Sequence, residues 1–325
     1  MCRRHTGVMA IRKPEPAAYD VVDERFNDLT VRTAQLRHLV DGCVWAEGPV
    51  YVPRDETVFF SDVRTNRQLR VDLTTEAVTV SRQPSEYSNG HTIDHDGVVI
   101  VCEHGTRSVR RLLADGNRPI VADRFEGNRF NSPNDVVVAA DGSVWFTDPT
   151  YGIDSNAEGY FALTEIGSSN VYRVDASTGD VTAEITNMVR PNGLAFSLDG
   201  RSLYVADTGV SHVPDGPRHI RRFDVEAGRV VGGTQAGVGD VFATCPVGAF
   251  DGFRLDRDGR IWASGAHGVH CYLADGTLLG TIRLPETCAN LEFGGADRHT
   301  LYMTATSSLY AIQVAVAGAP RPSAS

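Results

Sequence analysis

The stretch that decides the fold is NDVVVAADGSVWFTDPTYG, residues Asn134–Gly152. It contains an apolar run, an Asp-Gly turn and a second run rich in β-branched and aromatic side chains, which together predict a β-hairpin. A polar residue, Asn134, stands at the start of the first run, although burying an unpaired amide in a strand is costly. The presence of Asn134 therefore needs an explanation that lies outside this single hairpin.

Five other segments of the chain repeat the same pattern. They are EGPVYVPRDETVFFSD (47–62), NGHTIDHDGVVIVCEHG (89–105), NGLAFSLDGRSLYVADTG (192–209), DGFRLDRDGRIWASGAHG (251–268) and NLEFGGADRHTLYMTAT (290–306). In four of the six copies an Asp-Gly turn begins seven residues after the first residue, at Asp96, Asp141, Asp199 and Asp258. Arg54 takes that place in the first copy, and Asp297 followed by Arg298 takes it in the last. The fixed spacing indicates one structural unit repeated six times.

A second pair of strands follows most copies, as in 68–80, 170–185 and 220–233. Four strands in about 40–60 residues are typical of a propeller blade. We therefore predict an all-β fold, a six-bladed β-propeller with four antiparallel strands per blade. The last copy has room for only three strands, so an N-terminal strand within 31–40 is expected to close the ring and remove its open edges. The predicted single domain spans 16–315, with disordered tails at 1–15 and 316–325.

Composition narrows the classes of function. The 325 residues carry a formal net charge of −10, which argues against nucleic acid and membrane partners. No apolar run is long enough for a membrane helix, and the N-terminus lacks the apolar segment of a secretory signal. None of the six cysteines forms a C-x-x-C pair. We expect buried free thiols and, with them, a cytoplasmic location.

The first residues of the six copies explain Asn134. The first strand of a propeller blade lines the central channel, so these residues are expected to meet at one mouth of it. All six carry a side-chain oxygen: Glu47, Asn89, Asn134, Asn192, Asp251 and Asn290. Crowded carboxylates are costly unless they bind a cation, and an oxygen-only ligand set favours Ca²⁺, with Mg²⁺, Mn²⁺ or Zn²⁺ as alternatives. The competing interpretation is that these groups only cap strand ends.

The loops that follow the second strands are expected at the same mouth. They contain His104, Asp148, Tyr151 and His267. The two longest insertions, 152–169 and 209–219, fall on this side too and are candidates for a lid or for substrate selection.

Four segments together resemble a known family: AEGPVY (46–51), RFNSPNDVVV (129–138), RPNGLAFS (190–197) and AFDGFRLD (249–256). They are similar to signature segments of the gluconolactonase / senescence marker protein (regucalcin) family. CEHGTR (102–107) resembles the bacterial gluconolactonase branch. The resemblance covers about residues 40–310.

The resemblance implies a six-bladed propeller with one catalytic divalent metal in its channel. The implied ligands are Glu47, Asn192 and Asp251, and Asn134 either completes the site or touches substrate. The implied reaction is hydrolysis of a sugar lactone to the aldonic acid: the cation polarises the carbonyl and activates water, with Asp251 as the candidate catalytic base.

His104 and His267 are alternative bases because the unperturbed pKa of histidine is near neutral. In animal members of the family an arginine two residues before the Asn contacts the sugar, whereas Arg129 stands five residues before Asn134. The candidate substrate contacts are Asn89, Asn134, His104, Arg129, Asp148, Tyr151 and His267.

Other active-site signatures are missing, since the sequence contains no G-x-S-x-G, H-E-x-x-H or strand-linked G-x-G-x-x-G. Two alternatives remain open: a phosphotriesterase or other lactonase using the same metal site, and a calcium-binding propeller without catalysis. Two converging carboxylates, Glu47 and Asp251, favour catalysis over a scaffold. We expect a small-molecule sugar lactone as partner and a monomer or weak homodimer.

Overall fold

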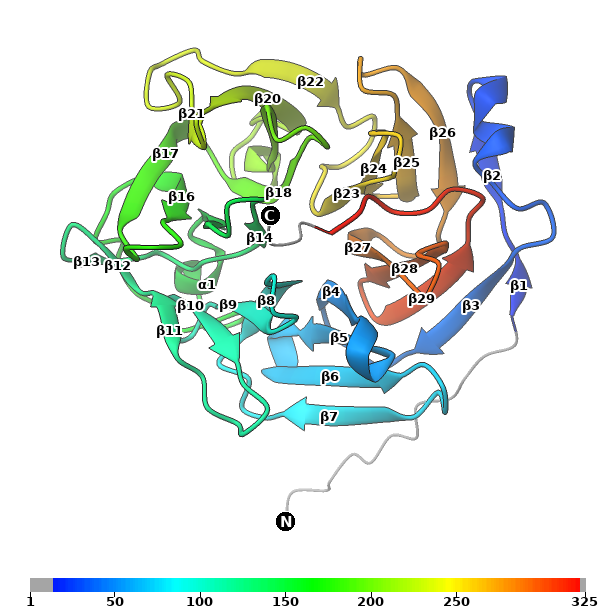
Figure 1. The fold of residues 1–325 in the computed structure, drawn as a ribbon, viewed down its shortest axis with the longest axis horizontal. Coiled ribbons are helices and arrows are strands. Elements are labelled where there is room, and N and C mark those ends of the chain that lie inside the picture. The colour runs from blue at the N-terminus through cyan, green and yellow to red at the C-terminus, as the bar shows by residue number, and fades with distance from the viewer. Residues whose placement is uncertain (1–13, 322–325) are drawn as a thin grey trace.

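Six small antiparallel sheets stand around a central axis and confirm the predicted six-bladed propeller (Figure 1). The computed structural model of the protein describes residues 14–321. One strand of each sheet lies nearest the axis, in the order β4, β8, β14, β18, β23 and β27 around the ring (Figure 1). Of the tails predicted at 1–15 and 316–325, residues 1–13 and 322–325 lie outside the described residues, whereas Glu15 belongs to a strand.

The first three blades follow the predicted order of four consecutive strands. Blade 1 comprises β4 (Ala46–Val52), β5 (Thr57–Asp62), β6 (Arg67–Asp72) and β7 (Val78–Arg82). Blade 2 comprises β8 (Ser88–Ile93), β9 (Val99–Glu103), β10 (Ser108–Leu112) and β11 (Ile120–Ala122), and is followed by a small hairpin of β12 (Arg124–Phe125) and β13 (Asn128–Arg129). Blade 3 comprises β14 (Val136–Val138), β15 (Val144–Asp148), β16 (Ser169–Val174) and β17 (Val181–Met188).

Blade 4 departs from the sequence pattern at its outer edge. It comprises β18 (Pro191–Phe196), β19 (Ser202–Asp207), β20 (His219–Glu226) and β22 (Asp240–Thr244). The segment expected to form the fourth strand, within 220–233, gives only the two-residue β21 (Arg229–Val230), which pairs with the end of β20. Glu184 of blade 3 accepts the backbone N–H of Val230 and holds that segment against the neighbouring blade. The edge position is therefore left to β22.

The ring closes where blades 5 and 6 meet the N-terminal segment. Blade 5 comprises β23 (Phe253–Leu255), β24 (Ile261–Gly265), β25 (Gly268–Tyr272) and β26 (Leu278–Arg283), with β2 (Tyr19–Val21) added at its edge. Blade 6 comprises β27 (Cys288–Gly294), β28 (Thr300–Ala305) and β29 (Ser308–Gln313). The predicted closing strand is β3 (Gln35–Val40), which pairs antiparallel with β29 and carries β1 (Glu15–Pro16) on its outer side.

Residues 316–321, which the sequence assigned to a disordered tail, lie against the domain. Val316 is buried, and Gly318 pairs with Asp256. The backbone N–H of Ala319 donates to the carbonyl of Leu255, and Arg321 reaches Tyr51 and Glu292. This segment therefore runs across the ring from blade 5 to blade 1.

Helices are few and short in the described chain. They are α1 (Tyr151–Asp154) and the 3₁₀ turns η1 (Glu24–Asp28), η2 (Pro53–Asp55), η3 (Val63–Thr65) and η4 (Gly209–Ser211). None of them has the length and apolar character needed to cross a membrane. The five described cysteines are all free and buried, as the sequence predicts.

The apolar core lies between neighbouring blades. In one cluster Ile100 and Val109 of blade 2 pack with Val136, Phe146 and Tyr172 of blade 3, and all five are buried. Side chains alternate across a strand, so one face of each sheet meets the next blade. Each blade is therefore held mainly by its two neighbours.

Glycines next to the ring residues allow the inner strands to touch. A glycine directly follows the first residue in four of the six copies: Gly48, Gly90, Gly193 and Gly252. A Cβ atom on any of them would overlap Asn89, Asn134, Asp251 or Asn290 of the next blade, respectively. The backbone N–H of Gly90 also donates to the carbonyl of Asn134 at 2.8 Å. The polar side chains converge because their backbones are in direct contact.

This packing predicts the effect of Gly193→Ala. The new methyl group would collide with the main-chain oxygen of Asp251, which cannot move without shifting blade 5. We expect a loss of about 1–3 kcal/mol in the free energy of unfolding, measured by denaturant titration. The control is Gly200→Ala, where no atom lies within 4 Å and only the positive φ of 68° opposes the change. A Gly193→Ala protein with wild-type stability would contradict the close contact.

Candidate active site

Two carboxylates from blades 1 and 5, which flank blade 6 in the ring, meet at one mouth of the channel. Glu47 is the second residue of β4, the inner strand of blade 1. Asp251 lies two residues before β23, the inner strand of blade 5. Their side chains lie close enough to shift each other's pKa; Glu47 is buried and Asp251 is half-buried. Burial and the neighbouring Asp251 raise the pKa of Glu47 well above its ordinary value, and burial and Asp135 raise that of Asp251 to about 7. A pair of this kind is stable in the ionised form only with a positive counter-charge.

Amide side chains lie beside this pair. Asn192, in β18, lies beside the carboxylate of Asp251 and lowers its pKa, and the hydroxyl of Tyr151 lies beside Asn192 in turn. Asn134 is 6% exposed, and its backbone is bonded to Thr147 and Gly90. No protein hydrogen bond involves its side-chain amide in the described part of the chain, so its carbonyl oxygen is available as a ligand.

This set of oxygens fits a hard divalent cation. Within residues 14–321 no three His, Cys, Asp or Glu side chains cluster as a metal site on their own. The two carboxylates would therefore need the amide oxygens of Asn192 and Asn134 to complete a shell. Carboxylate and amide oxygens with water are the ligands that Ca²⁺ prefers, whereas Zn²⁺ favours His and Cys.

A buried histidine orients Glu47. The backbone N–H of Gly48 donates to Glu47 Oε2 at 2.9 Å, and the carbonyl of the same glycine accepts a hydrogen bond from His91 Nδ1 at 2.7 Å. Because a carbonyl can only accept, the proton is on Nδ1, and Nε2 accepts from Gln68 Nε2 at 2.8 Å. Burial lowers the pKa of His91 to about 4, so the ring is neutral at neutral pH. His91 was missed in the sequence, although it stands two residues into its copy, where Val136, Leu194 and Phe253 are apolar.

His104 holds Asn89 in the same way. His104 is 1% exposed, and its Nδ1 donates to the carbonyl of Glu158 at 2.9 Å. Its Nε2 then accepts from Asn89 Nδ2 at 3.1 Å, which leaves the Asn89 carbonyl oxygen as an acceptor for a ligand. Both ring nitrogens are engaged and burial lowers the pKa, so the geometry assigns His104 to positioning rather than to proton transfer.

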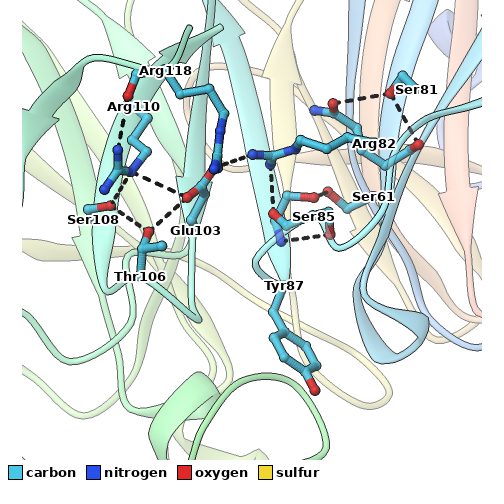
Figure 2. A network of polar contacts seen from close by, with 12 residues as sticks. Ser61, Ser81, Arg82, Ser85, Tyr87, Glu103, Thr106, Ser108, Arg110 and Arg118 are labelled. Atoms are coloured by element: carbon cyan, nitrogen blue, oxygen red, sulfur yellow. Dashed lines mark hydrogen bonds and ion pairs between the residues drawn. The ribbon is translucent and has the colours of Figure 1, made fainter. Parts of the chain in front are cut away.

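The turn that carries His104 is fixed by a charged network (Figure 2). The carboxylate of Glu103, which is fully buried, pairs with Arg82 at 2.5 Å and Arg118 at 2.6 Å and accepts a hydrogen bond from Thr106. Arg82 also donates to the carbonyl of Ser85 at 2.6 Å, so the network joins blade 1 to blade 2 (Figure 2). Charge-assisted bonds of this kind keep the end of β9 rigid.

The two long insertions meet above the site. Arg190 pairs with Asp154 at 2.7 Å, and its guanidinium lies 4.9 Å from the centre of the Tyr151 ring. His212 Nε2 in the 209–219 insertion lies 3.9 Å from Asp154 Oδ2 in the 152–169 insertion. The hydroxyl of Tyr151, just before the first insertion, lies 3.3 Å from Ser211 Oγ in the second. The sequence placed both insertions at this mouth, and these contacts join them into one wall.

Three predicted substrate contacts have other surroundings. Asp148 is fully buried, and its two carboxylate oxygens accept hydrogen bonds from the backbone N–H groups of Asn131 and Ser132, at 2.8 Å each. Asp148 therefore fixes the conformation of the segment before Asn134. The guanidinium of Arg129 donates to the carbonyl of Thr106 from the β12–β13 hairpin, outside the blades. His267 is exposed in the turn between β24 and β25. No described contact brings these three to the carboxylate pair.

The fold and the cluster of carboxylates and amides at one mouth define a six-bladed propeller with a polar channel site. Residues 45–307 match the family described as SMP-30/Gluconolactonase/LRE-like region, and the chain belongs to that family. A solved gluconolactonase from Xanthomonas campestris is 32% identical, with 94% of this chain and 99% of that chain covered and a TM-score of 0.85.

Two curated relatives cover most of the chain. A gluconolactonase from Zymomonas mobilis is 28% identical over 302 residues, which are 84% of this chain and 80% of the relative. A pentonolactonase from Haloferax volcanii is 29% identical and covers 81% of both chains.

The carboxylate pair predicts how the stability of the metal-stripped protein depends on pH. The folded pKa of Asp251, about 7, lies above its ordinary value of 3.8, so the folded state holds more protons in this window. Stability is therefore expected to fall as pH rises from about 4 to 7. In Asp251→Asn this fall should be smaller, because one charge of the pair is gone while Asp148 and the histidines are unchanged.

The measurement is the free energy of unfolding at pH 5 and pH 8 for both proteins after removal of metal. Adding Ca²⁺ at pH 8 should stabilise the wild type, by about 2.7 kcal/mol at a hundred times the dissociation constant, and leave the variant nearly unchanged. Identical pH profiles for the two proteins would rule out the repulsive pair.

Proposed function

We propose that this protein hydrolyses a sugar lactone to the open-chain aldonic acid. The proposal rests on the close pair of carboxylates of Glu47 and Asp251, which a non-catalytic scaffold would not need and which requires a positive charge beside it. The names of the relatives, gluconolactonase and pentonolactonase, support a lactone as the substrate class.

The same residues would hold the cation. Glu47, Asn134, Asn192 and Asp251 supply the protein oxygens, and Ca²⁺ is the ion that this ligand set favours, ahead of Mg²⁺, Mn²⁺ and Zn²⁺. A bound divalent cation polarises the lactone carbonyl and stabilises the negative charge that develops on its oxygen.

Asp251 is the proposed catalytic base. With a cation beside it, its carboxylate is ionised at neutral pH, and the oxygen not used for ligation accepts the proton that the attacking water loses. The same proton passes to the ring oxygen when the ester bond breaks, which releases the acid and the free hydroxyl. Glu47 is held by Gly48 and stays a ligand.

Polar groups around the pair select a sugar. Burial raises the pKa of Tyr151, so its hydroxyl stays protonated and can donate to a substrate oxygen. The carbonyl oxygen of Asn89, whose amide nitrogen is bonded to His104, can accept from a sugar hydroxyl. The five buried free cysteines support a cytoplasmic location for this activity.

Replacing Asp251 tests the proposal. Asp251→Ala should lower kcat/KM for δ-gluconolactone by about 10³-fold or more, because both a ligand and the base are lost. A pH-stat assay with added Ca²⁺ measures the rate, and Asp275→Asn, in an exposed turn of blade 5, is the matched control. Wild-type turnover in Asp251→Ala would reject Asp251 as essential. A phosphotriester assayed in parallel distinguishes a lactonase from the alternative phosphotriesterase. Faster hydrolysis of the phosphotriester than of the lactone would favour the phosphotriesterase.

Replacing Tyr151 tests whether its hydroxyl contacts the substrate. Tyr151→Phe keeps the ring beneath Arg190 and removes only the hydroxyl, so we expect kcat/KM to fall about tenfold, the loss of one hydrogen bond of about 1–1.5 kcal/mol. The affinity for Ca²⁺, measured by calorimetry, should not change. The control is Tyr160→Phe, whose ring is 51% exposed. Unchanged kcat/KM in Tyr151→Phe would show that its hydroxyl does not meet substrate.

A further inference from the structure

A second cavity lies at the opposite mouth of the channel. Its volume is about 890 Å³, and the far ends of the inner strands and the turns that follow them form its wall. The apolar part of the wall includes Val50, Ile93, Val138, Ala195 and Leu255. Since the ring residues stand at the starts of these strands, this cavity is separate from the site of Glu47 and Asp251.

Two of the six turns at this mouth, those of blades 1 and 6, lack the Asp-Gly pair of the repeat. The residue after the turn aspartate is glycine in four copies, with φ angles of 76°, 81°, 68° and 82° at Gly97, Gly142, Gly200 and Gly259, respectively. In blade 6 it is Arg298, with φ of 59°. A left-handed backbone conformation is unfavourable for a residue with a Cβ. Such strain is often found where the side chain has a functional role. The arginine side chain lines the cavity.

Positive charge is in excess around Glu292 in the wall of the cavity. Glu292 accepts from Arg254 Nε at 3.0 Å and from Arg321 Nη2 at 3.2 Å, and Arg298 lies within electrostatic reach of the same carboxylate. Arg254 is also shared with Asp135, at 3.9 Å. Two carboxylates, Glu292 and Asp135, therefore face three guanidinium groups, which leaves one positive charge in excess.

Two of these arginines have side-chain N–H groups without a hydrogen-bond acceptor. The buried atoms Arg298 Nε and Arg321 Nη1 have no hydrogen-bond partner. Burial lowers the pKa of Arg298, whereas the negative charge of Glu292 raises it. The neighbouring Arg321 and Arg254 also lower this pKa, because the three positive charges repel one another. Unsatisfied donors and unbalanced positive charge next to an empty space favour a bound anion.

We infer that this cavity binds a small organic monoanion, a carboxylate on a compact apolar body. The carboxylate lies against Arg298 and Arg321, and the body fills the space between the apolar ends of the inner strands. The volume falls in the range usual for small-molecule sites, about 300–1,000 Å³. Apolar walls with a charged end select an organic anion over inorganic phosphate. Anion binding in this cavity does not depend on lactone hydrolysis at the site of Glu47 and Asp251.

Calorimetric titration of the full-length protein with benzoate tests this site. We expect saturable binding of one benzoate per chain, at least tenfold weaker in Arg298→Gly and in Arg321→Met. Arg298→Gly supplies the residue that four other turns use, so it should fold normally, which its melting temperature checks. The matched control is Glu56→Gly, a change at another non-glycine left-handed position, φ of 49°, in a turn of blade 1 whose side chain does not line the cavity.

Glu56→Gly should bind benzoate like the wild type. Neutral benzamide and inorganic phosphate should each bind at least tenfold more weakly than benzoate. Absence of saturable benzoate binding, equal affinity in the arginine variants, or equal binding of benzamide or phosphate would overturn the inference.

Discussion

Direct backbone contact between the inner strands is the constraint on which the site depends. Gly48, Gly90, Gly193 and Gly252 each leave room for the ring residue of the next blade. A larger residue at these positions would push the blades apart and separate side chains that come from distant parts of the sequence. The dense packing between blades then fixes that geometry, because a packed interior resists small displacements.

The same closeness creates an electrostatic problem. Glu47 and Asp251 lie close together with Asp135 near both, and the pKa values of all three carboxyl groups are raised, mainly because they are removed from water. Arg254, which is half-buried, pairs with both Asp135 and Glu292. No arginine or lysine of the described chain forms an ion pair with Glu47 or Asp251, which is why we propose a cation beside these two carboxylates.

The repeat made the fold and part of the site predictable from sequence. The period, the Asp-Gly turns and the missing last strand led to six blades closed by β3, and the matched first residues led to Glu47, Asn192 and Asp251. Contacts that depend on side-chain direction were not predictable. Asp148 has the polarity of a ligand contact but turns behind the loop, while His91 and Arg254 act through residues distant in sequence. The edge strand β22 was missed because glycines and turn residues interrupt the pattern between 228 and 239.

The most direct test of the account is anomalous X-ray diffraction from crystals soaked in Mn²⁺, with Ca²⁺ as competitor. The account predicts one strong peak within bonding distance of the carboxylates of Glu47 and Asp251 and of the amide oxygen of Asn192, weakened by excess Ca²⁺. A peak located elsewhere in the channel, or no peak between these two carboxylates, would contradict it.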